Sequence, residues 1–139
     1  GGGSITAFYT VLAEGDDTND PIADAARGVL DGHIVLSRSL AESGHFPAID
    51  IEASISRVMP DIVDSKHIGM SRELRRLYSL YERNKDLISV GAYQAGSDVR
   101  IDEAIEKNAA ILEFLQQDMD EAVDISRSLT ELEVLLGVN

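Results

Sequence analysis

The stretch IEASISRVMP, residues 51–60, divides the chain into two parts of different character. Before it, short apolar runs rich in β-branched residues alternate with helical patterns. After it, apolar residues recur with the period of a helix. Arg57 is the one basic residue of this stretch, and its small and apolar neighbours predict a partly buried guanidinium that needs an anionic partner.

The residues alone leave two partners open for Arg57. One is a carboxylate of the same chain, Asp50 or Asp61, in an internal ion pair. The other is a phosphate held by another chain. The sequence contains no G-x-x-x-x-G-K-[ST] loop, so we expect no autonomous nucleotide hydrolase within these 139 residues.

The first part reads as strand, helix, strand, helix, strand. The strands are expected at residues 4–12, 33–37 and 45–50, and the first two are apolar enough to be buried on both faces. The helices are expected after Asp20-Pro21, where Asp supplies an N-cap, and over residues 38–43. This rhythm predicts a parallel α/β sheet. These elements cannot cover both sheet faces, so we expect the sheet to be completed by chain not present here.

The second part is predicted to be a small helical bundle. Apolar stripes indicate helices over residues 65–83, 100–117 and 120–136, the last with a break near Asp124. Ser128 and Glu131 have the spacing of a capping box, so a helix is expected to restart there. The predicted fold class is therefore α/β followed by all-α, with an α/β domain over residues 1–61 and a helical domain over residues 62–139.

The composition argues against several kinds of binding partner and binding site. The formal charge of −13 argues against binding nucleic acid or an anionic membrane surface. The chain has no cysteine and only scattered histidines, so no metal motif is predicted. Asp16, Asp17 and Asp20 share a loop but do not match a calcium-binding spacing. No segment resembles a signal peptide or a transmembrane helix, and we expect a cytoplasmic protein.

Phe46, next to Pro47, follows a strand-like segment. Residues at the carboxyl ends of parallel strands line ligand crevices, and an aromatic ring there stacks on a planar base. The alternative is an ordinary core aromatic. Both interpretations of Phe46 stay open on the residues alone.

Five segments together resemble the type III secretion ATPases, which are related to the α and β subunits of rotary ATP synthases. These segments are GSITAFYTVL (3–12), EGDD (14–17), DPIAD (20–24), LDGHIVLSR (30–38) and FPAIDIEASISR (46–57). NKDLISVGAYQAGSD (84–98) and Asp20-Pro21 look most like the flagellar export branch. The resemblance implies the C-terminal part of a RecA-like P-loop ATPase domain followed by a C-terminal helical domain.

The resemblance also implies roles for individual residues. Arg57 matches the family's arginine finger, which acts in trans on the ATP of a neighbouring subunit. Phe46 matches the aromatic residue that stacks on adenine. Met119 aligns near a second adenine-side phenylalanine of the ATP synthases and departs from it, so it is given no role. The loop from Glu14 to Asp20 matches the one that faces the central shaft.

Further expectations follow from the same resemblance. The full-length parent is expected to be an ATP hydrolase that uses ATP and Mg²⁺, while the piece alone is inactive and binds no cofactor. Expected partners are the neighbouring subunits of a homohexamer, a coiled-coil stalk protein, a peripheral regulator of the ATPase, chaperone–substrate complexes and the membrane export gate. The expected location is the cytoplasmic face of the bacterial inner membrane. The alternatives are an injectisome ATPase, or a non-catalytic module that binds a chaperone or the stalk.

Overall fold

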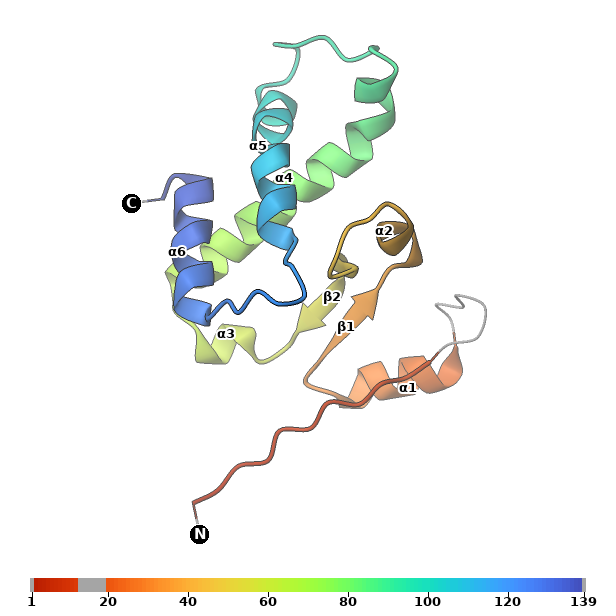
Figure 1. The fold of residues 1–139 in the computed structure, drawn as a ribbon, viewed down its shortest axis with the longest axis vertical. Coiled ribbons are helices and arrows are strands. Elements are labelled where there is room, and N and C mark those ends of the chain that lie inside the picture. Colours follow the sequence, from red (N-terminus) through yellow and green to blue (C-terminus); the bar gives the residue numbers. More distant parts are fainter. Residues whose placement is uncertain (1, 13–19, 139) are drawn as a thin grey trace.

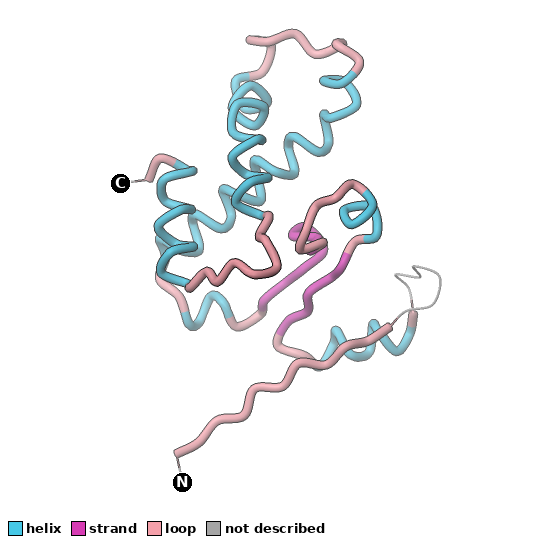
Figure 2. Tube along the Cα trace, viewed as in Figure 1, coloured by secondary structure: helices cyan, strands magenta, loops and turns pink. Residues whose placement is uncertain are grey.

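The computed structural model describes residues 2–12 and 20–138, and it consists of an α/β part followed by a helical part, as predicted. The elements in chain order are α1 (Pro21–Val29), β1 (Gly32–Leu36), α2 (Arg38–Glu42), β2 (Ile49–Ser56), α3 (Met59–Ile62), α4 (Ser65–Ser89), α5 (Val99–Leu115) and α6 (Ile125–Leu136). In Figure 1, α1, α2 and the two strands lie below and to the right of α4, α5 and α6. The tube in Figure 2 shows the two strands side by side, with the long helices on one side of them.

Helix α1 begins where the sequence predicts. The Asp20 carboxylate accepts hydrogen bonds from the amides of Ile22 (2.7 Å) and Ala23 (2.9 Å). Pro21 occupies the first turn, where its missing amide costs no helical hydrogen bond. The N-cap assignment of Asp20 is therefore confirmed.

The parallel pairing predicted for the strands is wrong for the two strands that the described residues form. β1 and β2 are antiparallel, with His33 opposite Ile55 and Leu36 opposite Ile49. The connection between them holds only the five-residue helix α2, whereas a parallel crossover normally carries a longer helix. Gly32 allows the close approach of the strands, because a Cβ atom there would lie 2.5 Å from the Ile55 carbonyl oxygen.

The first predicted strand is also absent from the described residues. Residues 4–12 adopt neither helix nor strand and run away from the rest of the molecule in Figure 1. Ile5 is 97% exposed and Phe8 is 89% exposed, although a strand buried on both faces was expected. A strand needs a hydrogen-bonded neighbour, and the described part of the chain places none beside this segment.

The hydrophobic core lies in the helical part. Leu77 of α4 and Ile111 of α5 are fully buried, and Leu132 of α6 closes the cluster at 5% exposure. The other buried members are Met70, Leu74, Tyr78 and Ala104. Ile51 of β2 packs against this cluster from the side, so the strand is tied to the helical core.

Several element boundaries differ from the prediction: β2 spans Ile49–Ser56 rather than residues 45–50, and α5 ends at Leu115 rather than residue 117. α4 continues to Ser89 rather than ending at residue 83, and Gly91, with φ of 70°, follows its end. α6 begins at Ile125, because the Asp124 carboxylate caps it by accepting from the Arg127 amide at 2.8 Å. The capping box at Ser128 is wrong: its hydroxyl donates back to the Asp124 carbonyl inside the helix.

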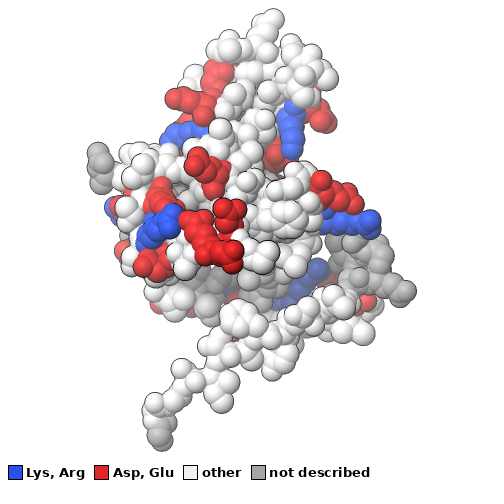
Figure 3. Space-filling view, in the orientation of Figure 1, with Lys and Arg blue, Asp and Glu red and all other residues white. Residues whose placement is uncertain are grey.

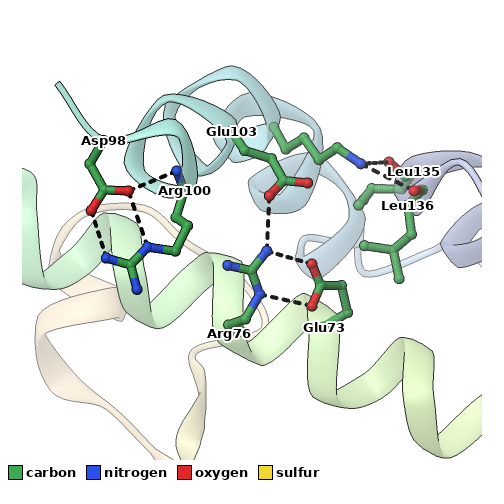
Figure 4. Close-up of polar contacts among 8 residues, drawn as sticks. Glu73, Arg76, Asp98, Arg100, Glu103, Leu135 and Leu136 are labelled. Carbon is green, nitrogen blue, oxygen red and sulfur yellow. Dashed lines mark hydrogen bonds and ion pairs between the residues drawn. The ribbon is translucent and has the colours of Figure 1, made fainter. Parts of the chain in front are cut away.

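Polar contacts join the three long helices at their surface (Figure 4). The Lys107 ammonium group donates to the carbonyls of Leu135 and Leu136 at the end of α6 (3.3 and 3.1 Å). Arg76 of α4 pairs with Glu103 of α5 at 2.9 Å and with Glu73 of its own helix. A cation at the carboxyl end of α6 also complements the helix dipole.

At the start of α5, Asp98 caps the helix and also pairs with Arg100. Its carboxylate accepts from the Arg100 amide at 2.9 Å and from the guanidinium at 2.7 Å. The side-chain hydrogen bond from Arg100, and then that from the Arg100 amide, lower the pKa of Asp98 to about 2. The ionised carboxylate is therefore the form that stabilises this end of α5.

We expect Leu77→Ala to lower the free energy of unfolding by about 3 kcal/mol, because it leaves a cavity at a fully buried position. Leu87→Ala is the matched control in the same helix, since Leu87 is 51% exposed, and it should change stability far less. Urea unfolding followed by circular dichroism measures both. Equal effects of the two substitutions would contradict this placement of the core.

Arg100→Gln should raise the pKa of Asp98 toward its ordinary value of 3.8, because the strongest hydrogen-bond donor to the carboxylate is removed. The native pKa lies below the unfolded one, so the ionised pair stabilises the fold above about pH 4, and that contribution disappears as the pH falls toward 2. Carbonyl-carbon NMR titration reports the pKa directly. An unchanged pKa in the variant would show that Arg100 is not its cause.

Candidate functional site

Arg57 follows β2 directly, and its guanidinium lies at the carboxyl end of α1. It donates to the carbonyls of Arg27 (2.8 Å) and Gly28 (3.2 Å), and its backbone amide donates to the Asp31 carbonyl (2.8 Å). These carbonyls belong to the last turn of α1 and the turn after it, where unpaired oxygens and the helix dipole favour a cation. Arg57 thus joins the end of β2 to the end of α1.

One sequence-based expectation about Arg57 is wrong, and one of the two partners left open for it is not observed. The residue is exposed rather than partly buried. Among the described residues, neither Asp50 nor Asp61 forms an ion pair with it; the Asp50 carboxylate instead accepts from two backbone amides of β2 at 2.9 Å. The guanidinium therefore lies beside neutral carbonyls, with no carboxylate within ion-pair distance in the described part of the chain.

Phe46 lies in the loop between α2 and β2, and its ring is 56% exposed. It is therefore not a core aromatic. The loop is held at several backbone positions: the His45 amide donates to the Leu40 carbonyl (2.9 Å), and the Ser37 amide donates to the Ala48 carbonyl (2.8 Å). The peptide bond between Phe46 and Pro47 is cis. The hydrogen bonds of the loop support the backbone from which the aromatic ring extends.

Phe46 and Arg57 lie beyond opposite ends of β2 and do not form one pocket. β2 is irregular between Asp50 and Ile55, and its two ends lie opposite Leu36 and Gly32 at the two ends of β1, which are about 13 Å apart. A nucleotide that touched both side chains of one chain would have to lie along the whole strand. The arrangement therefore favours contacts of Phe46 and Arg57 with two different nucleotides over contacts with the same one.

Sequence reasoning missed the environment of His45. Its side chain is 6% exposed, and the Gln116 amide group at the end of α5 lies 3.2 Å from its Nδ1 atom. A cavity of about 220 Å³ adjoins this contact. Its walls include Leu40, Ser43, His45, Tyr78, Tyr81, Glu82, Lys85, Asn108, Leu112 and Gln116. The sequence offered one signal for this contact, namely that the polar residue His45 directly precedes Phe46-Pro47.

A second hollow, of about 390 Å³, is lined by four arginines of α4 and α5, Arg75, Arg76, Arg83 and Arg100. Carboxylates offset much of this charge, since Arg76 pairs with Glu73 and Glu103, and Arg100 pairs with Asp98 (Figure 4). The hydrogen bond from Arg76 lowers the pKa of Glu73, and the same pairing raises the pKa of Arg76. The pairs of Arg76 and Arg100 are partly exposed and each contributes little to stability, while Arg75 donates to the Ser54 carbonyl.

The described residues bring together no group of three acidic or histidine side chains that could hold a metal ion. Asp16 and Asp17, in the loop that the sequence compares with the shaft-facing one, lie outside the described residues. Met119 is 98% exposed, after the end of α5.

The surface view in Figure 3 shows acidic and basic side chains interspersed over the helical part, while residues 2–12 carry no charge. No helix in residues 2–12 or 20–138 has both the length and the apolar run that crossing a bilayer requires. The face shown thus offers no continuous basic surface for a nucleic acid.

Two family models match the chain, one in each part. Residues 1–56 match the nucleotide-binding domain of the ATP synthase alpha/beta family, and residues 63–134 match the T3SS EscN ATPase C-terminal domain. The second match alone covers more than half of the chain.

Curated relatives agree with these models. The flagellum-specific ATP synthase of Pseudomonas aeruginosa is 60% identical over 99% of this chain and 30% of that protein. The type 3 secretion system ATPase of Pseudomonas syringae pv. syringae is 51% identical over 94% of this chain and 29% of its own length. The chain thus spans about a third of the length of these relatives.

Solved structures extend the likeness to the fold. The assembled ATPase EscN from the enteropathogenic E. coli type III secretion system superimposes with a TM-score of 0.93 and 44% identity, over 96% of this chain and 32% of that one. EscN in complex with its central stalk EscO gives a TM-score of 0.79 at 40% identity, over 84% of this chain and 29% of that one. The chain therefore belongs to the family of type III secretion ATPases, and its helical part is their C-terminal domain.

Proposed function

We propose that this chain is the C-terminal part of a flagellar export ATPase, which hydrolyses ATP in a homohexameric ring to power or regulate protein export. The observation that carries the proposal is the 60% identity to a flagellum-specific ATP synthase over 99% of the chain. The proposed domains are residues 1–61, the end of the RecA-like ATPase domain, and residues 62–139, the helical domain. On this proposal the piece by itself hydrolyses nothing, because its phosphate-binding residues lie elsewhere in the parent.

In the proposed ring, Arg57 is the arginine finger and acts in trans. Its exposure and its lack of a carboxylate partner among the described residues support the proposal, because the guanidinium remains free to meet an anion. Hydrogen bonds from arginine to phosphate are charge-assisted and stronger than those to neutral carbonyls. Exchanging the α1 carbonyls for a phosphate of the neighbouring subunit is therefore favourable once water is excluded.

Phe46 is proposed to stack on the adenine of the ATP bound by its own subunit. Its half-exposed ring on a supported loop favours this role. The placement of Phe46 and Arg57 beyond opposite ends of β2 is also compatible with this role, since the two residues would then serve two different nucleotides. Bound ATP and Mg²⁺ would supply the reacting phosphate and its charge neutralisation, while this chain contributes base binding and transition-state stabilisation.

We propose further partners by analogy with the solved relatives. EscN forms an assembled ATPase and a complex with its central stalk EscO, and we infer a homohexamer and a coiled-coil stalk for this protein. A peripheral regulator, chaperone–substrate complexes and the membrane export gate complete the proposal, at the cytoplasmic face of the inner membrane.

Two alternatives are kept. An injectisome ATPase shares every proposed site residue, and the 51% identity to the Pseudomonas syringae relative supports it less strongly than the flagellar match. A non-catalytic binding module would use the helical part, whose core is self-contained and whose Ile125 and Val134 are 70% and 77% exposed.

Arg57→Ala in the full-length parent should lower kcat by about 10³-fold or more, because an arginine finger contributes that much to phosphoryl transfer. ATP affinity should change little. Steady-state hydrolysis and equilibrium binding of a fluorescent nucleotide measure the two quantities. Arg72→Ala, at an exposed position of α4, is the control.

The trans action has its own test in mixed rings. Subunits with Arg57→Ala keep an intact phosphate loop, whereas subunits with a disabled phosphate loop keep Arg57. Mixing the two inactive variants should restore part of the hydrolysis, because some intact loops then face an intact Arg57. No recovery in rings shown to be mixed would argue that Arg57 serves its own subunit or none.

Phe46→Ala in the parent should raise the KM for ATP about ten-fold with a smaller change in kcat, because stacking on one base contributes about 1–3 kcal/mol. Phe46→Tyr keeps the ring and should behave like the native protein. An unchanged KM for Phe46→Ala would remove the adenine role.

A further inference from the structure

The end of α5 holds the loop that carries Phe46, although the two are far apart in sequence. The Gln117 backbone amide donates to the Phe46 carbonyl at 3.0 Å. The Gln116 side-chain amide nitrogen forms a hydrogen bond with His45 Nδ1 at 3.2 Å. Two consecutive residues of the helical part thus contact two consecutive residues of the α/β part.

The two partners of this contact, α5 and the loop that carries Phe46, are anchored in different parts of the fold. α5 is anchored in the helical core through Ile111 and Ala104, both fully buried against α4. The loop is anchored to the strands by the hydrogen bond between the Ser37 amide and the Ala48 carbonyl. The position of Phe46 relative to the helical part therefore depends on what joins the loop to α5.

Close packing does not replace these hydrogen bonds. The cavity of about 220 Å³ lies beside His45 and Gln116, so the packing around this contact is incomplete on that side, although His45 itself is only 6% exposed. Asn108 of α5, which also lines the cavity, has a buried Oδ1 atom without a hydrogen-bond partner in the described structure. With space behind the loop, a lost polar contact lets His45 and Phe46 move.

We propose that Gln116 and His45 are positioning residues for the base-stacking ring of Phe46, and that they make adenine affinity depend on the placement of the helical part. The proposal rests on the proposed adenine role of Phe46. Neither residue touches the nucleotide. They hold the loop so that the ring meets the base in one orientation.

Gln116→Met in the full-length parent tests the proposal, since methionine keeps the length and flexibility of the side chain but removes the donor. The KM for ATP should rise about three- to ten-fold, the loss expected for one hydrogen bond, while kcat stays within two-fold. The KM for CTP, whose smaller base stacks less, should rise less, so discrimination between the two nucleotides falls. Gln94→Met makes the same exchange on an exposed loop and should change neither KM.

Two further variants address the same contact. His45→Leu removes the acceptor, and combining it with Gln116→Met should add little to either effect alone, because both remove one interaction. Gln117→Pro removes the amide that binds the Phe46 carbonyl. Gln116, with φ of −102° and ψ of 150°, already has the conformation required before proline. This variant should also raise the KM for ATP.

The outcomes separate this proposal from the proposed function. If Phe46→Ala raises the KM for ATP but Gln116→Met leaves it unchanged, the positioning role is overturned and the adenine role stands. If Phe46→Ala has no effect, the adenine role fails and the positioning role fails with it. Equal rises in KM for ATP and CTP, or a lower melting temperature with unchanged discrimination, would show a purely structural contact and overturn the proposal.

Discussion

The burial of one face of α4 supports the rest of the structure. Leu77 lies against Ile111 of α5 and Leu132 of α6, and full burial of such a side chain contributes about 1.5–3 kcal/mol. The same helix also holds the sheet: Ile51 packs on its core, Arg75 donates to the Ser54 carbonyl, and the Ser79 hydroxyl donates to the Glu52 carboxylate. β2 is therefore positioned from its middle by α4, and the two proposed site residues lie beyond its ends.

This arrangement gives the two ends of β2 different properties. At one end, the Phe46 loop contacts α5 and so follows the helical part. At the other end, the Arg57 guanidinium donates to carbonyls of α1, through exposed hydrogen bonds that contribute about 1 kcal/mol each. Such bonds keep the guanidinium in place while it has no anion, and they are weak enough to be exchanged for a phosphate.

The sequence predicted the elements better than their pairing. The helices were recognisable because apolar periodicity and caps such as Asp20 are local signals. The antiparallel pairing of β1 with β2 depends on contacts between distant residues, which periodicity does not encode. Residues 4–12 have the composition of a buried strand, but burial needs a neighbouring strand that the described residues do not supply.

For the candidate site, the sequence identified the residues but not the contacts that they make. Local composition singled out Phe46 and Arg57 but left a carboxylate and a phosphate open as the partner of Arg57, and the family resemblance supplied the roles. The α1 carbonyls that it contacts could not be foreseen, because a turn brings Gly28 beside Arg57 only in the folded chain. The contact between His45 and Gln116 was missed for the same reason, since 71 positions separate the two residues.

The exposed segment at residues 4–12 has a consequence for how the isolated chain behaves in solution. It combines β-branched and aromatic residues with no charge and no proline, and its backbone groups have no strand partner among the described residues. Such a segment is a template for intermolecular β-pairing. Self-association of the isolated chain through residues 4–12 would therefore reflect the exposure of this segment. It would be a poor guide to the subunit contacts of the ring.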